Sequence, residues 1–139
     1  MKGSLFLFIT VLCILVSCVK ENTPTIPLND NVDTAANLKY KGNFMNGPYG
    51  TVSGMASVYR QNDSLVLALM NASISNGPDL HVYLSKEVQP INFIDLGKLQ
   101  STNGNQLYTI SGMPDFSQYK YALIHCKQFN HLFGSAELQ

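Results

Sequence analysis

The sequence carries few charges and no excess of either sign. Only 13% of its 139 residues are charged, and nine basic residues balance nine acidic ones. Proteins that bind nucleic acid usually present a basic face or a basic run, and neither occurs here. We therefore expect no nucleic-acid partner.

Motifs that would indicate an enzyme or a covalently bound cofactor are also absent. The sequence has no glycine-rich phosphate-binding loop, no nucleophile elbow and no His-Glu-x-x-His zinc motif. It lacks the Cys-x-x-Cys-His motif that attaches c-type haem, which excludes that form of haem. These patterns predict no catalytic residue.

Long hydrophobic segments are scarce, and the longest stands at the amino terminus. It extends from Leu5 to Val16, behind the single positive charge of Lys2. A run of about 12 residues is too short to cross a bilayer, which takes about 18 to 20, and is typical of a signal peptide. We expect residues 1–17 to direct export and then to be removed.

The end of this run, Leu15-Val16-Ser17-Cys18, resembles the bacterial lipobox. In that motif the cysteine is lipidated and the peptide bond before it is cut. The resemblance implies that acyl chains on Cys18 anchor the protein to a membrane, because several chains together give stable attachment. We therefore expect a lipoprotein of the bacterial cell envelope, on the periplasmic face or at the cell surface.

Cysteine is rare, and export changes what each cysteine can do. Of the three, Cys13 would be lost with the signal peptide and Cys18 would be lipidated. Cys126 would then be the only thiol of the mature chain, so no internal disulfide could form.

The chain after the lipidation site divides into two parts. Residues 18–37 are polar, contain Pro24 and Pro27, and have no sustained apolar period, which predicts a flexible tether. Residues 38–139 have the size of a single domain.

This domain has the pattern of an all-β protein. Apolar runs of five to eight residues alternate with turn-forming clusters at roughly ten-residue spacing. These clusters are NGPYG, RQND, SNGP, STNG and SGMPD. The pattern predicts a single antiparallel β-sandwich of two packed sheets.

Three segments allow sharper predictions. Residues 65–70 are apolar on both faces and predict a central strand. In residues 79–85, apolar and polar side chains alternate, so one face should meet a core and the other water or a site. Asn103-Gly104 predicts a two-residue hairpin turn, since both of its positions need a positive φ.

Four ordered blocks of residues 38–139 resemble the DM13 domain. They include Gly77-Pro78-Asp79-Leu80, Leu96-Gly97-Lys98-Leu99, Gly104-Asn105-Gln106 with Tyr108, and Cys126 with Phe129, Phe133 and Ala136. The resemblance implies a β-sandwich related to DOMON-type domains, found in extracellular and envelope proteins. It also implies a proposed role in electron transfer through the signature cysteine, which Cys126 matches. Family members often carry a histidine ahead of the Ser-Gly pair, where this chain has Tyr49-Gly50-Thr51.

Cys126, His81 and His131 are therefore the candidate redox or cofactor-binding residues. His125 should point away from Cys126, because neighbours along a strand face opposite sides. His131 could return over Cys126 if the chain turns at residues 128–130. His81 and Asp79 could hold a metal or simply form a polar outer face. A noncovalent haem held by Cys126 or a histidine would fit the resemblance, but neither cofactor nor metal is specified by the residues.

Two functions of different class follow. The first is a membrane-anchored electron-transfer domain that acts through Cys126 on an unidentified envelope partner. The second is a non-catalytic interaction module in which Cys126 is a small buried hydrophobe, on the same strand face as Ala122 and Ile124.

Overall fold

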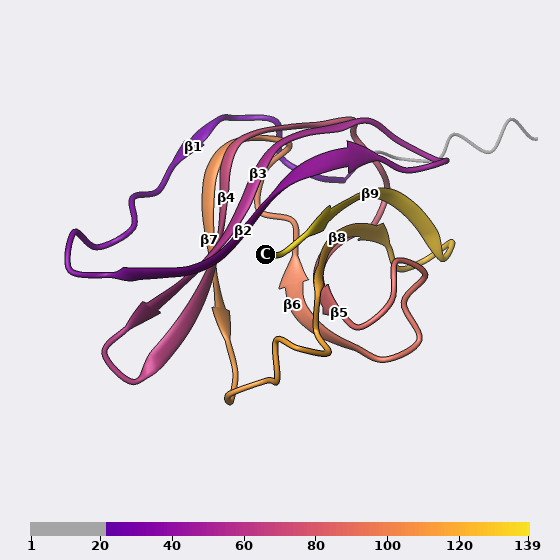
Figure 1. The fold of residues 1–139 in the computed structure, drawn as a ribbon. Helices are drawn as coiled ribbons and strands as arrows, with labels where there is room; N and C mark the ends of the chain where they lie inside the picture. Colours follow the sequence, from indigo (N-terminus) through magenta and orange to yellow (C-terminus); the bar gives the residue numbers. More distant parts are fainter. Residues whose placement is uncertain (1–21) are drawn as a thin grey trace, which may run out of the picture.

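The computed structural model describes residues 22–139, and every regular element in this range is a β-strand (Figure 1). No helix among these residues could cross a membrane. The signal peptide predicted over residues 1–17 and the lipidation site at Cys18 lie outside the described residues.

Nine strands follow one another along the chain. They are β1 (Leu28–Asn29), β2 (Asn37–Asn46), β3 (Val52–Gln61), β4 (Ser64–Ile74), β5 (Leu80–Ser85), β6 (Phe93–Lys98), β7 (Asn103–Ile110), β8 (Tyr121–Cys126) and β9 (His131–Glu137). Their order across the sheet is β1-β7-β4-β3-β2-β9-β8-β5-β6. Neighbouring strands are antiparallel except β1 and β7, which run parallel.

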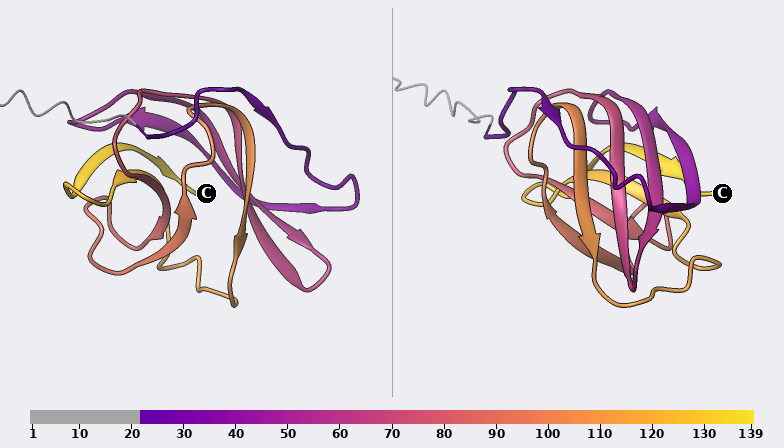
Figure 2. Two further views of the ribbon diagram at one scale, coloured as in Figure 1. Left: turned by 180° about the vertical axis from the view of Figure 1, so that it is seen from behind. Right: turned by 90° about the vertical axis from the view of Figure 1, so that its left-hand side faces the viewer.

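The prediction of two separate antiparallel sheets needs correction, because β2 belongs to both halves of the structure. Residues 37–43 of β2 pair with β3, whereas residues 44–46 pair with β9. The sheet therefore continues from one half to the other and curls into a half-barrel. Figures 1 and 2 show β7, β4, β3 and β2 facing β9, β8, β5 and β6. The fold is all-β, as predicted, but its sheet is single and mixed.

The core lies between the facing halves. On β4, Leu67 and Leu69 are fully buried, and on β5 Val82 and Leu84 face them from the other half. Burial of each such side chain contributes about 1.5 to 3 kcal/mol. The predicted central strand over residues 65–70 and the predicted core face of residues 79–85 are both confirmed. The other face of β5 does not meet water as the alternation suggested, because Tyr83 and Ser85 are buried and Tyr83 packs with Leu123 and Leu132 in a second cluster.

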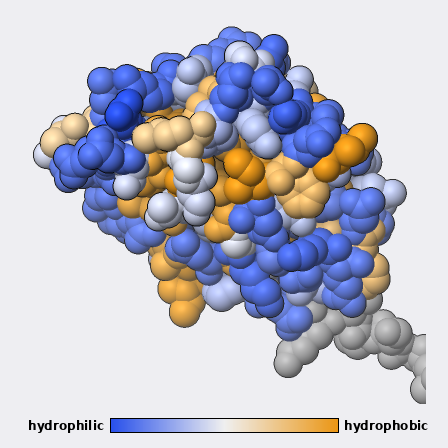
Figure 3. Space-filling view, turned by 90° about the horizontal axis from the view of Figure 1, so that it is seen from below, coloured by the Kyte–Doolittle hydropathy of each residue, from blue (hydrophilic) through white to orange (hydrophobic). Residues whose placement is uncertain are grey.

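One end of the half-barrel is spanned by residues 111–120, the loop between β7 and β8 (Figure 1). Phe116 of this loop stacks on Tyr40 of β2 with ring centroids 4.7 Å apart, and both pack against the core. Seen from this side, apolar surface gathers in the middle and is framed by hydrophilic residues (Figure 3).

The structure differs from the predicted tether over residues 22–29, which lie along the domain. The Thr102 amide donates to the Pro24 carbonyl (2.8 Å), and the Ser101 hydroxyl donates to the Ile26 carbonyl (2.6 Å). β1 then adds a short parallel strand to the edge of β7. Hydrogen bonds to backbone carbonyls need no particular side chains, so the polar composition of this segment gave no sign of them.

The predicted hairpin at Asn103-Gly104 is wrong, although Gly104 does have a positive φ of 96°. Both residues lie inside β7, and the chain reaches them by crossing over from β6. A Cβ atom on Gly104 would overlap the Leu28 carbonyl oxygen. The glycine thus permits the close approach of β1 rather than a turn.

Candidate functional site

Cys126 ends β8 and is paired on both sides. It lies opposite Leu80 of β5 and His131 of β9. Its side chain is 1% exposed and belongs to the core, on the same strand face as Ala122 and Ile124. The predicted strand face is confirmed, and Cys126 is a free thiol.

A hollow of about 360 Å³ lies over this cysteine. We call it the Cys126 cup. Its walls come from the loop after β2, the segment before β5 and the β8–β9 hairpin. The residues that line it are Tyr49, Pro78, Cys126, Phe129, His131 and Phe133. The cup is therefore mostly aromatic, with one thiol and one imidazole.

His131 reaches the cup because the chain turns over residues 127–130, where Asn130 has a φ of 53°. Residues that lie directly opposite each other in a sheet share a face, so His131 and Cys126 point the same way. The His131 ring stacks on Tyr49 with centroids 3.7 Å apart and planes at 2°. The structure thus places His131 beside Cys126, as the sequence allowed.

Tyr49 was not predicted to belong to the site. Its amide donates to the Leu132 carbonyl at 3.2 Å, which holds the loop after β2 against β9. Gly50 next to it lies under the Phe133 ring, where a Cβ atom would overlap the ring. The position at which this chain departs from the family pattern is therefore a wall of the cup. That departure was the one sequence signal pointing to it.

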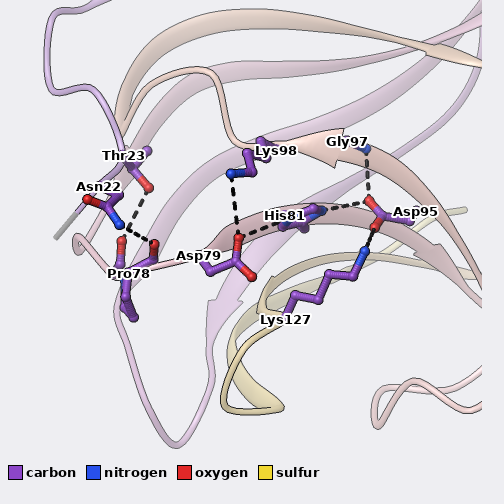
Figure 4. Close-up of polar contacts among 10 residues, drawn as sticks. Asn22, Thr23, Pro78, Asp79, His81, Asp95, Gly97, Lys98 and Lys127 are labelled. Carbon is purple, nitrogen blue, oxygen red and sulfur yellow. Dashed lines mark hydrogen bonds and ion pairs between the residues drawn. The ribbon is translucent and has the colours of Figure 1, made fainter. Parts of the chain in front are cut away.

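His81 lies on the other face of β5 and does not reach the cup. Its Nδ1 is 2.9 Å from Asp95 Oδ1, and its Nε2 is 3.2 Å from Asp79 Oδ1 (Figure 4). Both ring nitrogens are therefore occupied by carboxylates. Among residues 22–139, no three His, Cys, Asp or Glu side chains converge to hold a metal.

Asp95 is the centre of this polar cluster, and sequence reasoning missed it. It also accepts the Gly97 amide at 2.9 Å and the Lys127 ammonium at 3.1 Å. Burial alone would raise the pKa of Asp95, but hydrogen bonds from His81, Gly97 and Lys127 outweigh it and lower that pKa. Asp95 therefore stays ionised to a lower pH than an ordinary aspartate.

His125 also faces away from Cys126, as predicted. It is 2% exposed, and neither ring nitrogen has a hydrogen-bond partner. Its ring stacks on Tyr83 at 5.2 Å. Burial lowers the pKa of His125, and burial together with Asp95 raises the pKa of Tyr83 to about 12. Both groups are therefore neutral near pH 7. His125 cannot serve as the base for Cys126 because its ring lies on the opposite face of β8.

The residues of the cup do not fit a haem. An iron–thiolate bond needs the porphyrin to lie directly over the sulfur, yet the Cys126 side chain is 1% exposed. The rings of Tyr49 and His131, which could otherwise lie against a porphyrin, are stacked on each other. His81 has no free ring nitrogen, and His125 lies on the opposite face. Neither could join Cys126 as a ligand.

Comparison with known families gives one result. Residues 43–138 match the family described as Electron transfer DM13, a range that runs from β2 through β9 and includes the whole Cys126 cup. No curated protein and no solved structure matches the chain. Because the match covers well over half of its length, the chain belongs to the DM13 family.

Proposed function

We propose that this protein is a membrane-anchored lipoprotein of the bacterial envelope whose DM13 domain transfers electrons through Cys126. One observation carries the proposal: in a domain of an electron-transfer family, the only cysteine of residues 22–139 stands under an aromatic cup beside an imidazole. Lipidation at Cys18 would anchor the domain to the membrane.

The chemistry follows from having a single thiol. Cys126 as thiolate attacks one sulfur of a partner's disulfide, which forms a new S–S bond and releases the other sulfur as a thiolate. A thiolate of a second protein, which carries a dithiol, then attacks Cys126 Sγ in this mixed disulfide and releases the first partner with both of its sulfurs as thiols. The other thiol of the dithiol protein attacks that protein's own sulfur in the new mixed disulfide, which closes its disulfide and restores the Cys126 thiolate. Two electrons have then passed from the dithiol protein to the disulfide of the first partner. His131 is the group placed to take the Cys126 proton and give it back.

The test is reversible thiol chemistry at Cys126 in the native protein. Incubation with an oxidised low-molecular-weight disulfide should give one mixed disulfide per chain, located by peptide mass spectrometry and removed by reductant. His131→Gln should slow its formation near neutral pH, and Cys126→Ser should abolish it. A native thiol that exchanges no faster than the global unfolding rate would refute the proposal. A visible absorption spectrum of the protein purified from its host would show whether any coloured cofactor accompanies it.

The second candidate is a non-catalytic interaction module, and the near-complete burial of Cys126 favours it. A free cysteine in a core often acts only as a small hydrophobe. In that case Cys126→Ser would change stability alone, and no disulfide reagent would reach the wild-type thiol. The exchange experiment separates the two functions.

A further inference from the structure

Cys126 can react with a partner only if the wall of its cup moves, since its side chain is 1% exposed. Two walls of the cup, Pro78 and Phe129, belong to chain segments that also carry the charged residues Asp79 and Lys127. Pro78 precedes Asp79, and Phe129 follows Lys127 by two residues. Any contact between the Asp79 and Lys127 segments therefore also fixes the positions of these two walls.

The backbone supplies one tie between these segments. The Lys127 amide donates to the Asp79 carbonyl at 2.9 Å. This bond stands at the end of the β5–β8 pairing, immediately beyond the paired residues Leu80 and Cys126. A single hydrogen bond at the end of a ladder opens easily, so it does not fix the rim by itself.

Side chains on the other face of the sheet supply the second tie. Lys127 Nζ lies 3.1 Å from Asp95 Oδ2, Asp95 Oδ1 lies 2.9 Å from His81 Nδ1, and His81 Nε2 lies 3.2 Å from Asp79 Oδ1 (Figure 4). We call these four residues the His81 clasp. It runs from the segment before β5, through β5 and β6, to the turn after β8.

We propose that His81 and Lys127 are positioning residues, which hold the walls of the Cys126 cup over the thiol and so control the access of a redox partner to it. Neither touches the thiol. As far as it concerns a redox partner, the inference rests on the function proposed above. The claim about access stands on the contacts alone.

The burial of the clasp explains why it would hold the rim. The His81 side chain is 9% exposed, and the two carboxylates on either side of it are 24% and 26% exposed. Each ring nitrogen of His81 lies within hydrogen-bond distance of one carboxylate, so the ring bridges Asp79 and Asp95. Without His81, Asp79 and Asp95 would face each other across an unfilled gap, and their repulsion would push the Asp79 segment outward.

The experiment measures how fast iodoacetamide alkylates Cys126 in the full mature protein, with the site of modification read by peptide mass spectrometry. Removal of a hydrogen bond to a carboxylate of the clasp should raise the native alkylation rate by about tenfold in His81→Gln. In Lys127→Met the rate should rise by about two- to fivefold, because the Lys127 ammonium is 58% exposed and its ion pair is weaker. Lys127→Arg keeps the ion pair with Asp95 and should restore a rate near that of the wild type. In the double variant the alkylation rate should rise by less than the product of the two single increases, because both substitutions act through Asp95.

Two controls keep a local effect apart from a general loss of stability. Lys98→Met removes an ammonium that is 80% exposed and 4.0 Å from Asp79, and it should leave the rate unchanged. Val58→Ala removes two methyl groups at a fully buried position on β3, outside the clasp, and so lowers stability without touching the clasp. If Val58→Ala speeds alkylation as much as the clasp variants at equal loss of unfolding free energy, the inference is wrong.

Lys127 is 58% exposed, so Lys127→Met tests the inference even if His81→Gln does not fold. An unchanged rate in Lys127→Met, or a wild-type thiol that is alkylated at once, would overturn the clasp. A clasp effect together with a thiol inert to disulfide exchange would instead overturn only the proposed electron transfer.

Discussion

At the scale of single residues, Cys126 is buried like a core hydrophobe and also lines the cup. The structure shows its side chain in the core, so Cys126→Ser places a hydroxyl in an apolar cluster. We expect a loss of about 1 to 3 kcal/mol in the free energy of unfolding, measured by urea titration. A loss below about 0.5 kcal/mol would place this residue among exposed positions and contradict its burial.

His125 should make stability depend on pH. Its lowered folded-state pKa means that the unfolded chain binds more protons once the pH falls below the ordinary value of 6.5. The contribution of His125 to the free energy of unfolding is therefore fully present above pH 6.5 and decreases as the pH falls through that value. His125→Leu removes two unpartnered nitrogens at similar volume, so it should stabilise the protein by about 1 kcal/mol and flatten this dependence. If the free energy of unfolding, measured by urea titration, changes equally between pH 7.5 and 5.5 in the wild type and in His125→Leu, this prediction is wrong.

At the scale of strands, local sequence patterns predicted the positions of β4 and β5. The apolar run of residues 65–70 gave β4, and the alternation in residues 79–85 gave β5 and its core face. The alternation did not show that the second face of β5 is buried as well, where Tyr83 packs with Leu123 and Leu132. The division of β2 between two halves left no such trace. It depends on which backbone groups find partners, and every non-proline residue offers the same ones.

The candidate site was predictable to the extent that its members are close in sequence. Cys126 and His131 belong to one hairpin, so a turn between them was enough to bring them together. Tyr49 and Pro78 reach the cup from distant segments, and Asp95 meets His81 only because β6 pairs with β5. Long-range pairing of this kind is set by the packing of the whole sheet.

The segment before β2 gives a prediction at the scale of elements. Removal of residues 22–36 takes away the carbonyl acceptors of the buried Ser101 hydroxyl and Thr102 amide, so the truncated chain should lose about 1 to 3 kcal/mol of unfolding free energy. Gly104→Ala should also destabilise the full chain, through its positive φ and its overlap with the Leu28 carbonyl.

These two changes should not be additive. Once Leu28 is absent, Gly104→Ala retains only the cost of the positive φ, about 1 to 2 kcal/mol. The double-mutant cycle by chemical denaturation therefore measures the contact between β1 and β7 directly. Full additivity would mean that β1 does not lie against β7 in solution.

At the scale of the whole molecule, the curled sheet explains where the cup stands. The loop that carries Tyr49 leaves β2, the strand shared by both halves, and the Gly47 amide at its start donates to the Phe133 carbonyl at 2.7 Å. The cup is therefore built where the two halves join. A variation in that loop changes the wall above Cys126 without disturbing the core between the halves.

The packed segment also limits how far the domain can stand from a membrane. If Cys18 is lipidated, as we propose, only residues 19–21 lie between the anchor and Asn22, whose side chain donates to the Pro78 carbonyl. The four residue steps from Cys18 to Asn22 span at most about 14 Å when fully extended. The domain should then be held close to the bilayer, with Pro78, a wall of the cup, near the point of attachment.

Two measurements test this arrangement in cells and in vesicles. Cys18→Ala should abolish labelling by a radioactive fatty acid and move the protein from the membrane fraction to the soluble one. In vesicles, a fluorophore attached at Asn22 should be quenched by lipids that carry a spin label on the headgroup, and a flexible insertion of about 20 residues after Lys20 should relieve the quenching by extending the reach. Membrane attachment that survives Cys18→Ala would refute the lipid anchor. Weak quenching that the insertion leaves unchanged would refute the close approach.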